Sequence, residues 1–273
     1  MRTPLNERLL SNAAFLAILM VTACHAPESG GSTRGNTTDV ELLGSMVPQE
    51  VAGPADPAHP ATYLNDLSVE LAKDWPQNRT INIVCHGHSV PAGYFHTPVV
   101  DTFNAYPHLL HRALKELYPH AVINIITTAI GGENSSTGAP RFAADVLTHR
   151  PDLITIDYAL NDRRSGVEKA RASLESMLAE AKAAGIPVIL LTPTYDLRVN
   201  IGNPEDSLNL QANMVREVAH ARGVGLVDSL ATFLAEMESG TPAEDLMSGV
   251  NHPNRRGHDL VVVELMKWFT TER

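Results

Sequence analysis

The sequence has little cysteine, few aromatic residues and no excess of basic charge. Only 2 cysteines occur among 273 residues, which excludes a disulfide-dense scaffold and a four-cysteine zinc site. The formal charge of -10 at pH 7 argues against a nucleic-acid partner, which would require a basic face. Only one long apolar run is present, at the extreme N-terminus, so a multispan membrane protein is excluded. The overall composition, with 44% hydrophobic and 19% charged residues, is typical of a folded globular protein.

Residues 1–23 are predicted to be a signal peptide. The stretch from Ala13 to Ala23 is apolar except for Thr22, and it is too short to span a bilayer. It ends in Val-Thr-Ala before Cys24, which resembles a bacterial lipobox, and that resemblance implies cleavage before Cys24 and attachment of lipid to it. The chain is therefore expected to be exported and anchored to a membrane of the cell envelope. An ordinary secretory signal with an incidental Cys24 is the alternative.

Residues 24–60 are predicted to be a flexible tether, and residues 61–273 the folded domain. The tether is rich in Gly, Pro, Ser and Thr and cannot bury enough apolar surface to offset its conformational entropy. If Cys24 carries a lipid, Cys85 has no partner for an intrachain disulfide. Because Cys85 lies in an apolar strand, it is expected to be a buried, inert thiol.

The domain alternates strand and helix patterns. Short apolar runs predict strands at 80–85, 121–126, 152–157, 187–192 and 225–227. Apolar residues near a 3.6-residue period predict helices at 101–117, 139–147, 166–184, 205–222 and 255–269. This alternation predicts an α/β fold with a parallel sheet covered on both faces. In such folds functional groups gather at the carboxyl ends of the strands.

Four blocks of polar or glycine residues follow the predicted strands or precede the last helix. They are Gly87-His88-Ser89, Gly131-Gly132, Asn161-Asp162 and His252-Pro253. A serine hydroxyl is a weak nucleophile that needs a base, and histidine serves as a base because its pKa lies near neutral pH. Backbone N–H groups at a glycine turn and an asparagine amide can stabilise an oxyanion. Together these residue types predict an acyl-transfer site.

Each block also has a plain structural explanation. Ser89 could cap a helix or turn, and the glycine pair could serve only a tight turn. Asn161 could stabilise a loop, and His252 could be a loop histidine whose hydrogen bonds are satisfied. His86 and His88 would point to one face of a strand, which is an arrangement found in zinc sites. No third ligand is spaced to complete such a site, so no metal is expected.

The four blocks, in this order, resemble those of the SGNH hydrolases, also called GDSL-type esterases. The resemblance spans about residues 80–270. It implies that Ser89 is the nucleophile, that His252 is the general base, and that no cofactor is needed. It also implies an oxyanion hole made by the N–H groups of Ser89 and Gly132 and the amide of Asn161. The implied fold is a three-layer α/β/α sandwich with a five-stranded parallel sheet in flavodoxin-like order 2-1-3-4-5.

Two positions depart from the family pattern. His88 stands where the family usually has aspartate, and Gly249 stands where the family places the triad carboxylate, three residues before the histidine. The ring nitrogen of His252 that does not face the serine still needs a hydrogen-bond partner, which fixes the tautomer and orientation of the imidazole. The candidates are a backbone carbonyl near Ser248, the carboxylate of Asp245 and that of Asp228. The first would make a Ser-His dyad, which we favour.

The expected function is hydrolysis of carboxylic esters through an acyl-Ser89 intermediate. With 5% aromatic residues and no long hydrophobic insertion to form a lid, the chain is expected to act on short acyl groups, such as acetyl esters on carbohydrate. The absent triad carboxylate motivates one alternative, a catalytically silent lipoprotein that binds a glycan. A lysophospholipase or thioesterase is another.

Overall fold

Five parallel strands form the centre of the structure, a computed structural model that describes residues 56–270. The strands are β1 (Thr80–Gly87), β2 (Val122–Thr127), β3 (Leu153–Asp157), β4 (Val188–Leu191) and β5 (Gly225–Val227). Their spatial order is β2-β1-β3-β4-β5, which confirms the predicted fold class and strand order. The predicted signal peptide, Cys24 and most of the tether lie outside the described residues.

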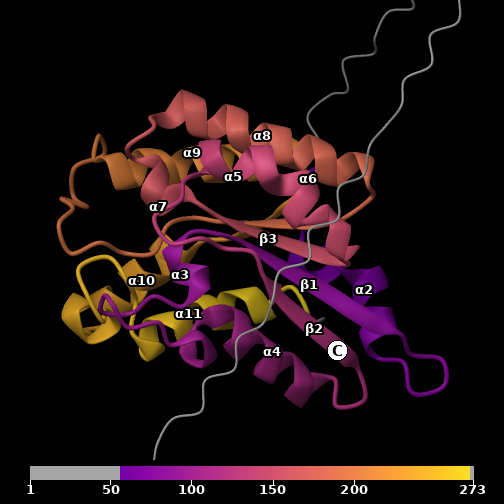
Figure 1. The fold of residues 1–273 in the computed structure, drawn as a ribbon. Helices are drawn as coiled ribbons and strands as arrows, with labels where there is room; N and C mark the ends of the chain where they lie inside the picture. Colours follow the sequence, from indigo (N-terminus) through magenta and orange to yellow (C-terminus); the bar gives the residue numbers. More distant parts are fainter. Residues whose placement is uncertain (1–55, 271–273) are drawn as a thin grey trace, which may run out of the picture. The chain divides into compact units, whose positions relative to one another are not determined.

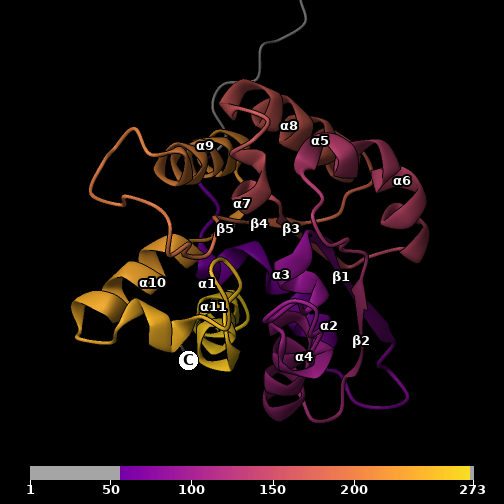
Figure 2. The ribbon, with the colours of Figure 1, turned by 60° about the vertical axis from the view of Figure 1, so that its left-hand side comes forward.

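Helices cover both faces of the sheet, so the architecture has three layers (Figures 1 and 2). One face is covered by α5 (Ser135–Gly138), α6 (Phe142–Asp145), α7 (Ala159–Asp162), α8 (Val167–Ala183) and α9 (Ser207–Arg222). The other face is covered by α1 (Pro60–Tyr63), α2 (Asn65–Leu71), α3 (Ser89–Ala92), α4 (Tyr106–Leu117), α10 (Ser229–Glu238) and α11 (Arg255–Met266). Among residues 56–270, no helix is long and apolar enough to cross a membrane.

The central strands β1, β3 and β4 are buried on both faces, as the apolar runs predict, whereas the edge strand β2 is partly exposed. All five residues of β3 are buried, and Ile81 and Ile83 of β1 are completely buried. Burial of Cys85, which forms no disulfide within residues 56–270, raises the pKa of its thiol to about 12. Cys85 is therefore a neutral thiol in the core.

Two predicted helices are shorter than the sequence pattern indicates. The helix expected at 101–117 begins only at Tyr106, because Ala105 has extended backbone and Pro107 occupies the first turn of α4. The segment expected as one helix at 139–147 is divided into a 3₁₀ turn (Ala139–Arg141) and α6, with a second 3₁₀ turn (Leu147–His149) after it. The helices α2 and α10 were not predicted from the sequence.

Candidate active site

The polypeptide reverses sharply between β1 and α3, and Ser89 is the first residue of α3. Gly87 makes this possible, because a Cβ atom there would lie 2.4 Å from the Asp157 carbonyl oxygen of the neighbouring strand. His88 caps the helix with its Nδ1 atom, which accepts a hydrogen bond from the Val90 N–H at 3.2 Å. Ser89 is 6% exposed, so its hydroxyl is held at the edge of the sheet with little contact with solvent.

The imidazole of His252 contacts the Ser89 hydroxyl although 163 positions separate them in the sequence. The distance from His252 Nε2 to Ser89 Oγ is 2.9 Å. On the other side of the ring, Nδ1 lies 2.8 Å from the carbonyl oxygen of Phe95. Because a carbonyl oxygen can only accept, Nδ1 carries the proton and Nε2 is free to accept the proton of the serine.

The Phe95 carbonyl is fixed by a small hairpin after α3. Tyr94 pairs with Val100 in an isolated antiparallel bridge, and the Phe95 N–H donates to the Val99 carbonyl at 3.0 Å. The Phe95 ring packs against the ring of the buried His258, with a centroid separation of 5.2 Å. Both contacts restrain the carbonyl that orients His252.

None of the three groups considered from the sequence orients the His252 ring. The Asp228 carboxylate is bound to Arg216, with 2.7 Å between Asp228 Oδ2 and Arg216 Nε, and it accepts from the Ala231 N–H at the start of α10. Asp245 is exposed. Ser248 contacts the backbone of His252, since its N–H donates to the His252 carbonyl at 2.9 Å. The Nδ1 atom of His252 is therefore bound by a backbone carbonyl, as in the favoured dyad. That carbonyl belongs to Phe95, 157 positions before His252, and not to the segment near Ser248.

Burial lowers the pKa of His252 below its ordinary value of 6.5. The hydrogen bond to the Phe95 carbonyl acts in the opposite direction, and the nearby ring of His88 lowers the pKa further. At neutral pH the imidazole is thus predominantly neutral, which is the state that a general base requires.

Two backbone N–H groups of the predicted oxyanion hole have no acceptor among the described residues. Neither the Ser89 N–H nor the Gly132 N–H donates to another group among the residues that the structure describes. Gly132 has φ of +80° and follows Gly131 in a turn that the Glu133 N–H closes on the Ile130 carbonyl at 3.2 Å. This left-handed conformation suits glycine and turns the peptide between Gly131 and Gly132.

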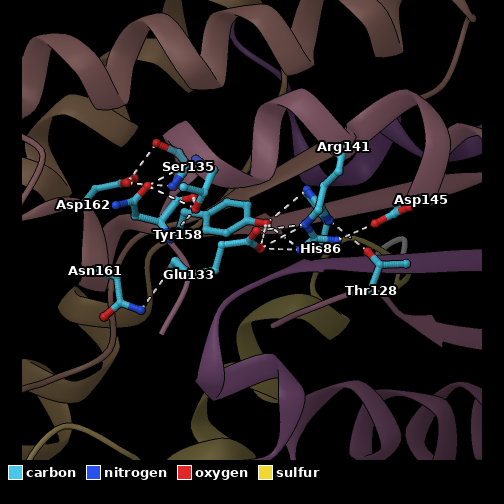
Figure 3. A network of polar contacts seen from close by, with 11 residues as sticks. His86, Thr128, Glu133, Ser135, Arg141, Asp145, Tyr158, Asn161 and Asp162 are labelled. Carbon is cyan, nitrogen blue, oxygen red and sulfur yellow. Dashed lines mark hydrogen bonds and ion pairs between the residues drawn. The ribbon is translucent and has the colours of Figure 1, made fainter. Parts of the chain in front are cut away.

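Asn161 lies in α7, directly after β3, and its side-chain amide donates to the Glu133 carbonyl at 2.8 Å (Figure 3). One of the two N–H groups of that amide is satisfied in this way. The neighbouring Asp162 faces away from the cleft and accepts two hydrogen bonds from Ser135, both at 2.8 Å. Asp162 therefore attaches the start of α5 to α7.

A buried carboxylate that the sequence analysis did not single out lies beside His88. Asp157, the last residue of β3, is 2% exposed, and its Oδ1 atom lies 3.3 Å from Nε2 of His88. Strand register brings the two together, since Gly87 pairs with Asp157. An acidic residue at the end of an apolar strand was the available signal in the sequence.

Residues 56–270 contain no cluster of three or more His, Cys, Asp or Glu side chains that could hold a metal ion. The Nδ1 atom of His86 lies 2.8 Å from Thr128 Oγ1 and its Nε2 atom 3.1 Å from the Tyr158 hydroxyl, so both ring nitrogens have protein partners. A cavity of ≈ 740 Å³ lies at the opposite, amino ends of the strands, between residues such as Asp152, Val188 and Arg222. It contains neither Ser89 nor His252.

Comparison with known proteins identifies the family. The model of the GDSL-like Lipase/Acylhydrolase family matches residues 85–260, which is more than half of the chain. The chain belongs to this family and is a carboxylic ester hydrolase. The predicted SGNH family is thereby confirmed.

Relatives with known names agree with this assignment. An acetylxylan esterase from Geobacillus stearothermophilus is 25% identical over 161 residues, which cover 53% of this chain and 71% of the relative. A crystal structure of an acetylxylan esterase from that organism has a TM-score of 0.60 at 20% identity, covering 70% of this chain and 95% of that one. An alpha/beta hydrolase enzyme from the metagenome of Lake Arreo, Spain, has a TM-score of 0.61 at 20% identity, covering 71% and 96%. At these identities the two structures show a shared fold.

Proposed function

We propose that the protein hydrolyses acetyl esters of carbohydrates through an acyl-Ser89 intermediate, with His252 as general base. The contact between His252 Nε2 and Ser89 Oγ, at 2.9 Å, carries this proposal. Further support comes from the hydrogen bond between His252 Nδ1 and the Phe95 carbonyl, because it leaves Nε2 free to accept the serine proton.

The chemistry follows from these positions. Ser89 Oγ attacks the ester carbonyl carbon while its proton moves to His252 Nε2. The tetrahedral intermediate then expels the sugar oxygen, which takes the proton from Nε2, and an acetyl group remains on Ser89. A water molecule next gives a proton to Nε2 and attacks the acetyl carbon. Release of Ser89 Oγ, which recovers the proton, yields acetic acid and the free enzyme.

The N–H groups of Ser89 and Gly132 and the free N–H of the Asn161 amide stabilise the oxyanion. Support comes from the lack of other acceptors for the two backbone groups among the described residues. It also comes from the hydrogen bond that Asn161 gives to Glu133, because this bond leaves one amide hydrogen for the substrate. Fixed donors of this kind stabilise the charge of the transition state more than that of the ester.

An acetyl group is favoured by the surroundings of the nucleophile as well as by the relatives. The Tyr94 ring lies beside the oxyanion turn, since a Cβ atom on Gly131 would be 2.8 Å from its Cε2 atom. The same ring is 6.2 Å from the imidazole of His252, centroid to centroid. Tyr94 thus occupies space beside both groups and restricts the room for a long acyl chain.

Steady-state hydrolysis of p-nitrophenyl acetate and of acetylated xylooligosaccharides by the full-length protein tests the proposal. Ser89→Ala should abolish both activities, and Ser239→Ala, which alters an exposed serine at the end of α10, should leave them unchanged. Equal rates for Ser89→Ala and the wild type would overturn the mechanism. Faster hydrolysis of p-nitrophenyl decanoate or of acyl thioesters would instead favour a lysophospholipase or thioesterase.

We further propose that the enzyme is exported and held at the cell envelope by lipid on Cys24. Support comes from the sequence Val-Thr-Ala-Cys after an apolar segment. The test is incorporation of radiolabelled palmitate during expression in bacteria. Labelling should be lost in Cys24→Ser and retained in Cys85→Ser, because only Cys24 lies at the lipobox. Labelling of Cys24→Ser would contradict the proposal.

A further inference from the structure

Glu133 is connected to the proposed oxyanion hole through its N–H and its carbonyl, and its side chain is bound by Arg141 and Tyr158 (Figure 3). We propose that Glu133 is a positioning residue, whose carboxylate, bound by Arg141 and Tyr158, holds the Gly132 N–H and the Asn161 amide in place for the oxyanion. This inference rests on the proposed function, because it concerns how the donors of that site are placed.

The backbone of Glu133 determines where two donors lie. Its N–H closes the turn that presents Gly132, by donating to the Ile130 carbonyl at 3.2 Å. Its carbonyl accepts the Asn161 amide at 2.8 Å and so sets which way that amide points. A movement of the Glu133 peptide would therefore displace both donors together.

The side chain of Glu133 lies in a polar cluster with Arg141 and Tyr158. It is only 8% exposed. Arg141 Nε lies 2.9 Å from Glu133 Oε1 and 3.1 Å from Oε2, and the terminal nitrogen of the guanidinium also binds Oε2. The Tyr158 hydroxyl donates to Oε2 at 2.9 Å. The carboxylate thus has three donors from two side chains, which restrains its position.

Tyr158 connects this cluster to the strands that carry the other parts of the site. It follows β3 and directly precedes α7, which contains Asn161. Its hydroxyl accepts from Arg141 at 3.1 Å and lies 3.1 Å from Nε2 of His86, a residue of β1. The cluster therefore links Glu133 to β1 and β3 as well as to the short helices around Arg141.

The chemistry of the cluster explains why the carboxylate matters. An amide in place of the carboxylate would present an N–H₂ group either to the N–H donors of Arg141 or to the O–H donor of Tyr158. Among the described residues, Arg141, 17% exposed, would retain only one carboxylate partner, Asp145, which lies 3.2 Å away and is 47% exposed. The loss of a partner from a buried ion pair leaves the other charge uncompensated, and the Glu133 backbone would then shift.

Kinetics of Glu133→Gln in the full-length protein test the proposal. Removal of a single oxyanion donor typically lowers kcat by roughly 100- to 1,000-fold, so a displaced donor should lower kcat by about 10- to 100-fold. KM should change less than about threefold, because these donors act on the transition state rather than on the bound ester. Asp145→Asn is the matched control: it removes the exposed partner of Arg141 and should retain wild-type kinetics.

A double-mutant comparison separates positioning from a general structural effect. In an Asn161→Ala background, one of the two donors that Glu133 holds is already missing and only the Gly132 N–H is left to be displaced, so Glu133→Gln should lower kcat by a smaller factor than in the wild type. Equal factors in both backgrounds would overturn the proposal. If Glu133→Gln does not fold, Tyr158→Phe, which removes one hydrogen bond to the carboxylate, should give the same pattern with a smaller loss.

A spectroscopic measurement tests, independently of activity, whether Glu133 positions the Asn161 amide. In ¹⁵N-labelled protein, the side-chain amide resonance of Asn161, assigned through Asn161→Ala, should shift in Glu133→Gln and Tyr158→Phe but not in Asp145→Asn. An unchanged resonance would overturn the inference about Glu133. Full activity of Ser89→Ala would overturn the proposed function instead, and the resonance would still report whether Glu133 holds Asn161.

Discussion

His252 donates its Nδ1 proton to the carbonyl oxygen of Phe95 at 2.8 Å, while its Nε2 atom faces Ser89. A neutral carbonyl thus occupies the position beside the imidazole that a carboxylate fills in a Ser-His-Asp triad. A carbonyl can fix the tautomer and the orientation of the ring. It stabilises the imidazolium that forms during catalysis less than a full negative charge would.

Gly249 offers a place for that missing charge. A Cβ atom on Gly249 would lie 3.9 Å from the Phe95 carbonyl oxygen, in ordinary van der Waals contact. Gly249→Asp should therefore bring a carboxylate close to His252 Nδ1. We expect kcat for p-nitrophenyl acetate to rise by about tenfold, because a carboxylate stabilises the imidazolium in the transition state.

The uncharged variant Gly249→Asn is the control for Gly249→Asp. It adds a side chain of similar size without the charge, so it should leave kcat near or below the wild-type value. An opposite charge within about 4–6 Å commonly shifts a pKa by about 1–3 units, and Gly249→Asp should raise the apparent pKa of His252 accordingly. Equal kcat values and equal pH profiles for the two variants would contradict a role for added charge.

The pH dependence of the wild-type enzyme follows from the state of His252. Burial lowers its pKa below 6.5, and only the neutral imidazole can accept the Ser89 proton. As pH rises, kcat/KM should increase through an apparent pKa below 6.5 and then reach a plateau. A series of kcat/KM measurements from pH 4.5 to 8.5 gives this value. A profile without an acid limb would exclude His252 as the base.

Asn161→Ala should lower kcat by roughly 100- to 1,000-fold, because it removes one oxyanion donor. The binding of substrate should weaken much less, so KM should change little. Asn78→Ala, which alters a partly buried asparagine that donates to the His120 carbonyl, is the matched control. If Asn161→Ala and Asn78→Ala have the same kcat, the Asn161 amide does not contact the oxyanion.

The sheet could be predicted from the sequence because its strands are continuous apolar runs, such as the fully buried Leu153–Asp157. Helix boundaries were harder to predict from the sequence, since they depend on single residues. The extended backbone of Ala105 and Pro107 in the first turn make the helix predicted at 101–117 begin only at Tyr106. The helix α10 was not predicted because it follows β5 directly, and its start depends on the cap that Asp228 provides.

The residues that face the cleft were predictable where a side chain carries the chemistry, as for Ser89 and His252. The Phe95 carbonyl was not, because every residue has a carbonyl and only the hairpin after α3 brings this one to His252. The connection of Glu133 to Asn161 likewise uses a backbone carbonyl. Sequence patterns report side-chain chemistry, whereas backbone contacts between distant segments require the folded structure.

Two buried histidines should make the fold sensitive to mild acid. Burial lowers the pKa of His86 to about 4 and that of His258 to about 3. Below pH 6.5 the unfolded chain binds protons at these positions that the folded chain does not. Stability should therefore fall as pH decreases, by about 1.4 kcal/mol per pH unit for each histidine.

Protonation of Asp162 has the opposite effect on stability as pH decreases, and this provides an internal control for the prediction. Burial raises its pKa to about 6, so between pH 6 and its unfolded value of 3.8 the folded chain binds the extra proton. The free energy of unfolding, from urea denaturation, should be lower at pH 5 than at pH 7 by roughly 2–3 kcal/mol. In Asp162→Asn this decrease should be larger by about 1 kcal/mol, because the opposing contribution is gone. Equal stability of the wild type at both pH values would contradict the assignment of His86 and His258 as neutral in the folded state.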